Sequence, residues 1–318
     1  MMAVKTDAQL ARLSAIKADP SSPDAVAEIA KALRGKSTVV AAQAAEIVAN
    51  AKLESLESAL LEAFARFMSE ADKGCIAKSA IARALLEIES RAELTVMRGA
   101  RHVQMEPAFP RAVDVAGEMR AVCAVALVNM RSRQAITVLV HHLADTEPFV
   151  RAAAVRTLAA HGGDAAEALV RYKLLVGDDD VAVIADCFPA AIALTRSTAA
   201  VEPFLDSRDE ILREAAILSI GESRAPRAFE LLRDRWNGEF DPEMRKLLAT
   251  SIALTRQPAA IEFLVQRAAQ DHSKVAIIAI EALAIYRSDD AMRAKLAEIA
   301  QKRGGEVLAE FRKAFASR

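Results

Sequence analysis

Arginine and acidic residues recur at matching positions along the chain. Each acidic residue lies five residues before an apolar position, and each arginine directly follows such a position. A guanidinium group can bind a carboxylate or a phosphate through two parallel hydrogen bonds, so a row of arginines could in principle hold a charged ligand. Because catalytic residues do not normally recur once per repeat, we expect these residues to form hydrogen-bonded columns inside the fold instead. The arginines are Arg120, Arg151, Arg213 and Arg245, and the acidic residues are Asp114, Asp145, Asp179 and Glu239.

Two of the histidines have an acidic residue four positions later, a spacing that places two metal ligands on one face of a helix. The pairs are His102 with Glu106 and His141 with Asp145. Neither pair has a third ligand nearby, and His141 and His142 would point about 100° apart on a helix. We therefore predict no metal site. The three cysteines form no Cys-x-x-Cys pair and are expected to be small core residues.

Motifs for covalent or nucleotide chemistry are missing from the sequence. It contains no Gly-x-Ser-x-Gly, no Walker loop and no Gly-x-Gly-x-x-Gly. The pairs Gly162-Gly163 and Gly304-Gly305 fall where helices are expected to end. The prediction is a protein with no catalytic residues and no cofactor, and therefore not an enzyme.

The elements that would position any site are predicted to be helices. Alanine occurs 69 times among 318 residues, whereas aromatic residues make up 4%, and alanine favours helix over strand. The formal net charge is -1, which argues against the basic surface of a general nucleic-acid-binding protein. No apolar run is long enough for a membrane span or a secretory signal, so we expect a cytoplasmic protein without membrane contact.

One pattern recurs along the chain: an apolar residue, a small or apolar residue four positions later, and an apolar residue four positions after that. The clearest copy is Val150, Ala154 and Leu158, and this spacing marks one face of a helix. The mean period of about 34 residues fits a pair of helices. It predicts about nine antiparallel pairs in one domain over residues 1–318, closed by a capping helix at 303–318. The copies begin at Val40, Ile76, Met119, Val150, Ile184, Leu212, Met244 and Val275.

Capping residues predict several helix ends. Asp164 with Glu167, and Ser207 with Glu210, have the spacing of a capping box, and Asp241 precedes a proline at the first helical position. Glycines that follow apolar runs are expected to end helices with a positive φ. These glycines are Gly35, Gly221 and Gly238.

The segment from Asp145 to Leu158 resembles the first helix of a HEAT-type repeat, in the bacterial form related to phycobilin-lyase HEAT-like units. The resemblance covers about residues 5 to 300 and is weakest in the copy of Ile184, where Pro189 should kink the first helix. In such families the recurring acids and arginines bond between neighbouring repeats. The resemblance implies an all-α α-solenoid superhelix whose inner, concave surface is formed by the second helices and binds another macromolecule.

One repeat is longer than the others. The copies that begin at Ile76 and Met119 are 43 residues apart, so about nine residues are inserted within region 91–113. Insertions in a solenoid often lie on its binding face, whereas the alternative is a loop that packs Met105 and Phe109 over the neighbouring repeat. The candidate partner-binding residues are Arg98, Arg101, His102, Gln104, Glu106 and Phe109.

Repeat packing explains every strong pattern, so the sequence predicts a non-enzymatic scaffold for protein–protein interactions. An unidentified protein or peptide would lie along the second helices, and the oligomeric state is left open. The rival interpretation is a HEAT-like solenoid that binds nucleic acid or repairs DNA as a glycosylase does, through a local basic patch that the net charge hides. Candidate contacts on the second helices are Arg171, Arg227, Arg235, Trp236 and Arg267.

Overall fold

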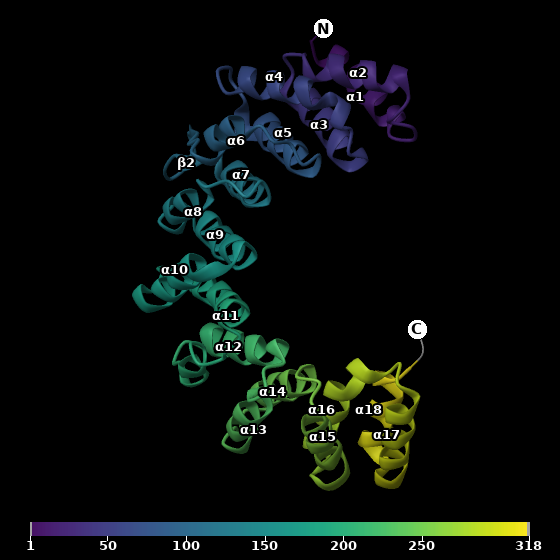
Figure 1. Ribbon diagram of the computed structural model, residues 1–318. Helices are drawn as coiled ribbons and strands as arrows, with labels where there is room; N and C mark the ends of the chain where they lie inside the picture. Colours follow the sequence, from purple (N-terminus) through teal and green to yellow (C-terminus); the bar gives the residue numbers. More distant parts are fainter. Residues whose placement is uncertain (1, 317–318) are drawn as a thin grey trace. The chain divides into compact units, whose positions relative to one another are not determined.

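The computed structural model describes residues 2–316, and most of these residues lie in helices (Figure 1). The chain forms two compact units, Met1–Ala166 and Glu167–Arg318, each with its own stack of helices. The continuity expected of a single domain over residues 1–318 therefore stays a prediction.

The first unit alternates between the first and second helices of successive pairs. The first helices are α1 (Met2–Ile16), α3 (Thr38–Ala51), α5 (Ile76–Glu87), α7 (Gly117–Asn129) and α9 (Pro148–His161). The second helices are α2 (Pro23–Leu33), α4 (Glu57–Phe67), α6 (Glu93–Ala100) and α8 (Ala135–Leu143). The 3₁₀ turns η1 (Glu54–Leu56) and η2 (Lys73–Cys75) precede α4 and α5, and the strands β1 (Met105–Glu106) and β2 (Val113–Asp114) lie between α6 and α7.

The second unit continues this alternation, and α10 (Gly163–Val176) contains the division between the units. Its first helices are α11 (Val181–Thr195), α12 (Glu210–Ser223), α14 (Pro242–Leu254) and α16 (Ser273–Leu283). The elements that follow them are the 3₁₀ segment η3 (Glu202–Asp206), then α13 (Ala228–Asn237), α15 (Pro258–Gln270), and η4 (Ala284–Tyr286) with α17 (Asp290–Arg303). The closing helix α18 (Gly305–Ala314) packs on α16 and α17. The last two residues of the predicted cap, 317 and 318, lie outside the described residues.

Residues 2–316 thus hold nine helix pairs and a closing helix, if η3 is taken as the second element after α11. The all-α fold of stacked helix pairs predicted from the period is confirmed. The predicted apolar positions account for the packing, because the first residue of every copy is buried except Ile76, which is exposed, and Leu212, which is half-buried. The three cysteines are free and buried, as expected.

The first helices form the continuous layer of each stack. In the first unit α3 contacts α5, α5 contacts α7 and α7 contacts α9, whereas contacts between successive second helices are sparser. Because the alanine-rich first helices can approach one another closely, the first unit curves toward them, with α4, α6 and α8 on the outer side (Figure 1). In this unit the inner side is therefore formed by first helices, which differs from the arrangement that the HEAT resemblance implies.

The recurring arginines stabilise the loops that precede the first helices. Three of them donate to a backbone carbonyl oxygen six residues earlier in the same repeat. Arg120 shows the bond between neighbouring repeats that the resemblance implies, because it pairs with Asp145 of the next one. The bonds within a repeat are Arg151 to Asp145 O at 2.9 Å, Arg213 to Ser207 O at 3.0 Å and Arg245 to Glu239 O at 2.7 Å.

The helix starts agree only in part with the capping residues predicted from the sequence. Asp241 caps α14 as predicted and accepts a hydrogen bond from Met244 N at 2.9 Å. The cap of α12 is Asp209 instead of Ser207, and Asp164 lies inside α10 because that helix begins one residue earlier than the predicted cap. Helix α11 continues through Pro189 to its end.

The helix ends differ more clearly from the prediction that glycine would end them with a positive φ. Gly221 lies inside α12, and Gly238 follows α13 with a φ of -97°. The positive φ that glycine was expected to supply is instead adopted by charged residues in several turns between the helices of a pair. For a residue with a Cβ this conformation costs roughly 1 kcal/mol or more. The basic residues concerned are Lys52, Arg131, Arg196, Arg224 and Arg256, with φ between 49° and 57°.

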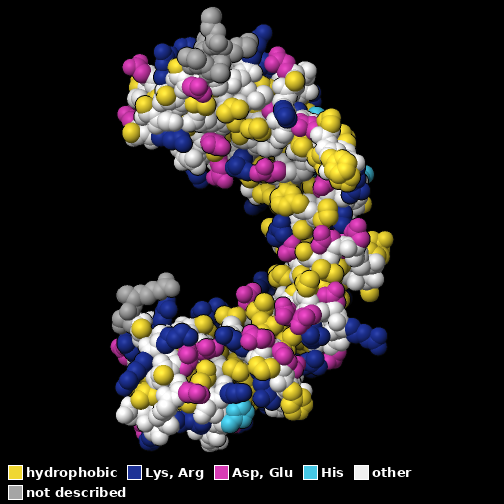
Figure 2. Space-filling view, turned by 180° about the vertical axis from the view of Figure 1, so that it is seen from behind, with side chains coloured by type: hydrophobic (Ala, Val, Ile, Leu, Met, Phe, Trp, Pro, Cys, Tyr) yellow, Lys and Arg dark blue, Asp and Glu magenta, His cyan; other side chains and the backbone are white. Residues whose placement is uncertain are grey.

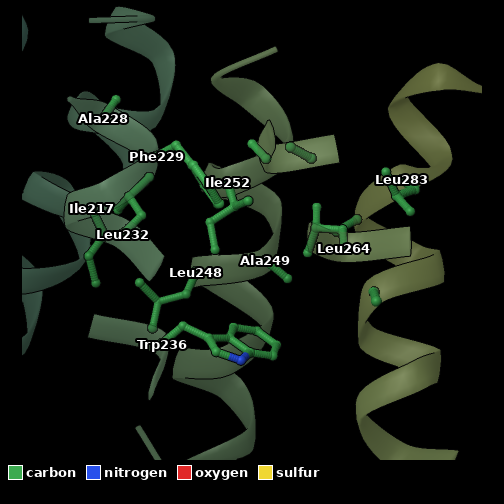
Figure 3. Close-up of a cluster of buried hydrophobic side chains, with 14 of the residues drawn as sticks. Ile217, Ala228, Phe229, Leu232, Trp236, Leu248, Ala249, Ile252, Leu264 and Leu283 are labelled. Carbon is green, nitrogen blue, oxygen red and sulfur yellow. The ribbon is translucent and has the colours of Figure 1, made fainter. Parts of the chain in front are cut away.

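The core of the second unit explains the burial of its only tryptophan (Figure 3). Trp236 of α13 packs beside Leu248 and Ala249 of α14, and its ring meets Phe263 edge-on at 6.0 Å. The side chain is 5% exposed. The expectation that Trp236 contacts a partner is therefore wrong, because the α13–α14 packing covers its indole ring.

We predict that Gly221→Ala destabilises the second unit by roughly 1–3 kcal/mol, although alanine is the better helix former. A methyl group at this position would lie 2.5 Å from Ser251 O and 2.8 Å from Ser251 Cβ, where α12 crosses α14. The matched control is Gly238→Ala, whose Cβ would lie 3.9 Å from its nearest neighbour. Thermal unfolding by circular dichroism measures both variants, and equal midpoints would contradict the close approach.

Candidate partner-binding site

The insertion between the copies of Ile76 and Met119 is a two-stranded ribbon with a connecting loop. Strands β1 and β2 pair antiparallel, with Met105 opposite Asp114 and Glu106 opposite Val113. Region 91–113 also contains α6, so the inserted residues are those that follow Ala100. The ribbon therefore gives residues 102–106 an extended alternation in which successive side chains face opposite sides.

The polar side chains of the ribbon bind to the turn that precedes α5. The side-chain amide of Gln104 donates to Asp72 O at 2.6 Å and to Glu106 Oε1 at 2.7 Å. Gly74 N donates to the same Glu106 oxygen at 2.7 Å. The hydrogen bonds from Gly74 and Gln104 favour the carboxylate and lower the pKa of Glu106. These bonds fix β1 to the solenoid.

A buried lysine accounts for the polar inner face of the ribbon. Lys78 of α5 is 3% exposed, and its Nζ contacts Gln104 Oε1 and lies 3.4 Å from His102 Nε2. Burial and the neighbouring Lys78 ammonium lower the pKa of His102, which favours the neutral ring as a hydrogen-bond acceptor. A buried charge is tolerated only with such partners, and the ribbon supplies them.

Arg120 of α7 joins the ribbon to the next helix pair. Its side chain is 3% exposed and makes two hydrogen bonds of 2.9 Å to the carboxylate of Asp145, which precedes α9. The same guanidinium pairs with Asp114 of β2 and donates to His102 O at 3.0 Å. One buried cation therefore fixes both β2 and the loop before α9.

The carboxylate of Asp114 is held in its charged form by the groups around it. Burial alone would raise the pKa of Asp114, but backbone N–H donors from Gln104 and Ala116 and the guanidinium of Arg120 outweigh that effect and lower the pKa. Asp114 therefore keeps its charge opposite Arg120 throughout the neutral range.

Four apolar side chains of the insertion are exposed to solvent. Val103 and Met105 alternate with the inward-held His102, Gln104 and Glu106, Phe109 lies in the connecting loop, and Val113 stands opposite Glu106 on β2. In most antiparallel sheets the apolar side chains pack on the core and the polar side chains face solvent. Here the polar side chains face inward and the apolar ones face solvent. The predicted alternative, a loop packed over its neighbour by Met105 and Phe109, is wrong because Lys78 and Arg120 draw the polar side chains inward. The exposed fractions are 59% for Val103, 58% for Met105, 100% for Phe109 and 44% for Val113.

A groove of about 280 Å³ adjoins this apolar face between the ribbon and α8. Arg101 and Val103 line it from the ribbon, and Val138 and His141 line it from α8. Asp145 completes the lining with Arg120, so a buried ion pair borders an aliphatic wall. We define the ribbon surface as Val103, Met105, Phe109 and Val113 together with this groove.

The structure divides the residues predicted for the insertion into two groups. Arg98, Arg101 and Phe109 are exposed to solvent, whereas the side chains of His102, Gln104 and Glu106 are held by contacts within the protein. The sequence analysis missed Val103, Met105 and Val113 as exposed residues of the surface. The polar and apolar alternation through residues 102–106 is the signal that would have indicated a strand with two unlike faces.

The candidate arginines of the second helices are each bound to a nearby carboxylate in the second unit. An arginine that already has an intramolecular partner must exchange that partner to bind another protein, which makes these positions weaker candidates than the ribbon surface. The pairs are Arg171 with Glu167 at 2.9 Å, Arg227 with Glu202 at 3.8 Å, Arg235 with Asp206 at 2.7 Å and Arg267 with Asp271 at 3.4 Å.

Neither histidine pair forms a metal centre. Within residues 2–316 no three His, Cys, Asp or Glu side chains gather as metal ligands. His102 and Glu106 lie in the ribbon instead of on a helix, and Asp145 is bound to Arg120. Across the same residues no helix is both long and apolar enough to span a membrane.

Comparisons with known proteins give limited information. The sequence matches no family model and no curated protein. The chain is similar to a structure of the complex of CpcE and CpcF of phycocyanin lyase from Nostoc sp. PCC7120, with 16% identity over 80% of this chain and 93% of that chain and a TM-score of 0.39. An engineered protein is similar with 17% identity, over 91% of this chain and 94% of that chain, at a TM-score of 0.19. Because both TM-scores lie below 0.5, neither similarity supports an argument about the fold, which rests on the helix pairs described above.

We predict that Arg120→Met costs roughly 3–5 kcal/mol, because it leaves the buried carboxylates of Asp114 and Asp145 without their cation. The control is Arg83→Met, which removes an exposed pair with Glu118 and should cost less than about 1 kcal/mol. Thermal unfolding measures the loss, and hydrogen exchange locates it in residues 101–116. Similar losses in the two variants would contradict the central position of Arg120.

A second prediction concerns pH. His142 of α8 is 3% exposed, and its Nε2 donates to Ala100 O at 2.7 Å. Burial lowers its pKa below 6.5, so as pH falls through 6.5 the unfolded chain binds a proton that the folded chain excludes. Stability should then fall by up to about 1.4 kcal/mol per pH unit for this histidine. His142→Gln, which keeps an N–H donor, should give a smaller decline between pH 7 and 5 in chemical denaturation; an unchanged decline would contradict the assignment.

Proposed function

We propose that this protein is a non-enzymatic scaffold that binds another protein, and that the ribbon surface is its principal contact. The observation that carries this proposal is the orientation of the ribbon, whose polar side chains face the solenoid and whose apolar side chains face solvent. Contiguous exposed apolar side chains on a well-ordered element are typical of interaction sites.

The hydrophobic effect favours covering this surface. Burial of a large apolar side chain contributes roughly 1.5–3 kcal/mol, yet Phe109 is 100% exposed. Its neighbours on the ribbon are fixed through Gln104 and Glu106 to the turn before α5. A rigid support lowers the entropy lost when a partner binds, so the ribbon is well suited to presenting an aromatic anchor.

The groups around the ribbon define the chemistry of the partner. Arg98, Arg101 and Arg111 are exposed near the apolar side chains, and the groove beside Val103 is partly aliphatic. A complementary partner has an apolar pocket for Phe109, an acidic rim, and a side chain that enters the groove. These features support a contact on the ribbon over one along a concave row of second helices.

The nucleic-acid alternative requires a continuous basic area. On the face drawn in Figure 2, Lys and Arg side chains are interspersed with Asp and Glu in both units. Alternating signs weaken the attraction for phosphate. Retention on heparin at ~0.15 M salt that falls steeply as salt rises would favour this alternative over the scaffold.

We predict that the triple variant Val103→Ser, Met105→Ser, Phe109→Ser weakens capture of the protein partner by about 30-fold or more. Because these side chains are exposed, each change should alter stability by less than about 0.5 kcal/mol. Partners recovered from the native host on immobilised protein are identified by mass spectrometry, and their affinities for purified variants are measured by calorimetry.

A matched variant distinguishes specific binding by the ribbon from non-specific hydrophobic binding. Ile211→Ser, Leu175→Ser and Phe240→Ser remove three exposed apolar side chains from the second unit and should leave partner affinity unchanged. Equal binding by the ribbon variant, equal loss in both variants, or repeated recovery of no partner by the wild-type protein would each overturn the proposal.

A further inference from the structure

Four arginines share one position in the second unit, at the turn that leaves each first helix. Arg196, Arg224 and Arg256 follow α11, α12 and α14 with φ of 56°, 52° and 57°, and Arg287 follows η4. All four are exposed. Because they occupy the same place in successive stacked pairs, they lie along one edge of the unit, which we call the arginine edge.

The guanidinium groups of this edge differ from those of most other arginines in the second unit. No hydrogen bond or ion pair joins any of the four side chains to another residue of the described chain. Elsewhere in the described part of the same unit most arginines are bound to carboxylates, carbonyl oxygens or aromatic rings, with Arg208 and Arg312 as the exceptions. Those with such partners include Arg213, Arg227, Arg235, Arg245 and Arg267.

Hydrogen bonds between neighbouring turns fix the edge. Gln257 Nε2 donates to Ala225 O at 2.8 Å, and Tyr286 OH donates to Ala253 O at 2.6 Å. Burial raises the pKa of Tyr286, and the positive charges of Arg256 and Arg224 partly offset that rise. The backbone that carries the arginines is therefore held in register from one pair to the next.

A groove of about 430 Å³ opens on this edge between α11 and α12. Pro189, Ile192 and Ala193 give it an aliphatic wall, Arg196 lines it at the turn, and Glu222 is the one carboxylate in its lining. Its size and its apolar wall suit a single large apolar side chain.

We propose that the arginine edge binds an acidic peptide segment of a partner protein, with one apolar side chain of the segment seated in the α11–α12 groove. Neighbouring helix axes lie about 8–10 Å apart, and an extended chain advances about 3.3 Å per residue. Carboxylates at every third position therefore match successive arginines, and each guanidinium can bind one of them through two hydrogen bonds.

Charge on the flanking residues favours a peptide over a nucleic-acid strand. Glu222, Asp289 and Asp290 lie close in sequence to the arginines and are exposed. A strand with a phosphate on every nucleotide would bring charge against these carboxylates. A peptide with acids at every third position places neutral residues there. This inference concerns the second unit and does not depend on the ribbon surface.

The test uses a fluorescein-labelled synthetic peptide with glutamate at every third position and one phenylalanine, followed by fluorescence anisotropy at ~0.15 M salt. The full-length protein should bind it, and the variant Arg196→Gln, Arg224→Gln, Arg256→Gln should bind about tenfold more weakly or worse. The charge-matched control Arg208→Gln, Lys274→Gln, Arg312→Gln changes exposed residues away from the edge and should keep the affinity.

A second triple variant, Arg196→Gly, Arg224→Gly, Arg256→Gly, separates binding from folding. Glycine adopts a positive φ without a penalty, so this variant should unfold at an equal or higher temperature and still lose the peptide. The proposal is overturned if the wild-type protein does not bind, if a peptide with glutamine for glutamate binds equally, or if both charge-matched variants lose affinity alike. Tighter binding of an oligo-dT strand at the same arginines would also overturn it, in favour of nucleic acid.

Discussion

The structure depends on one constraint: a first helix with apolar residues on two sides must be covered by both of its neighbours. Ala216, Ala249 and Ala279 are fully buried at successive first helices, and their small side chains allow the close approach that Gly221 and Ser251 make most acute. Once the first helices pack in this way, the turn between the helices of each pair falls at the same edge every time. The position of the arginine edge is thus a consequence of helix packing.

The same constraint explains why an insertion is tolerated where it occurs. Residues 101–116 leave and re-enter the stack between α6 and α7, so the added length does not disturb the contacts of α5 with α7. Loop closure entropy grows slowly with length, and the ribbon gains hydrogen bonds to the buried charges of Lys78 and Arg120. Lys78 contacts His102 and Gln104 on the inner side of the extended segment, and strand alternation then turns Val103 and Met105 outward.

The sequence predicted the helices and their buried positions, which follow from the periodic pattern. It did not predict the features that depend on single contacts between distant residues. Val150, Ala154 and Leu158 are buried because their spacing places them on one apolar face of a helix, which packs against neighbouring helices. Lys78 lies among alanines in a helical pattern, and nothing in the sequence indicates that it is buried until the ribbon is seen to cover it. Gly221 follows an apolar run and so resembles a helix end, but the approach of Ser251 gives it a packing role inside α12. The orientation of the ribbon could not be predicted because it depends on residues 24 or more positions away.

Arginines have two distinct roles in this chain, and the backbone φ of the residue differs between the two groups. Arg151, Arg213 and Arg245 each reach a carbonyl oxygen six residues earlier, so their charge helps to fix a loop and replacement would expose an unpaired acceptor. Arg196, Arg224 and Arg256 occupy a conformation that glycine would adopt with less strain, and their side chains make no bond that offsets this cost. A basic side chain at such a position does not help the turn itself. The charge of such an arginine is available to a ligand. The arginines bonded within a repeat stabilise its loop, whereas the unbonded arginines at the turns can bind another molecule.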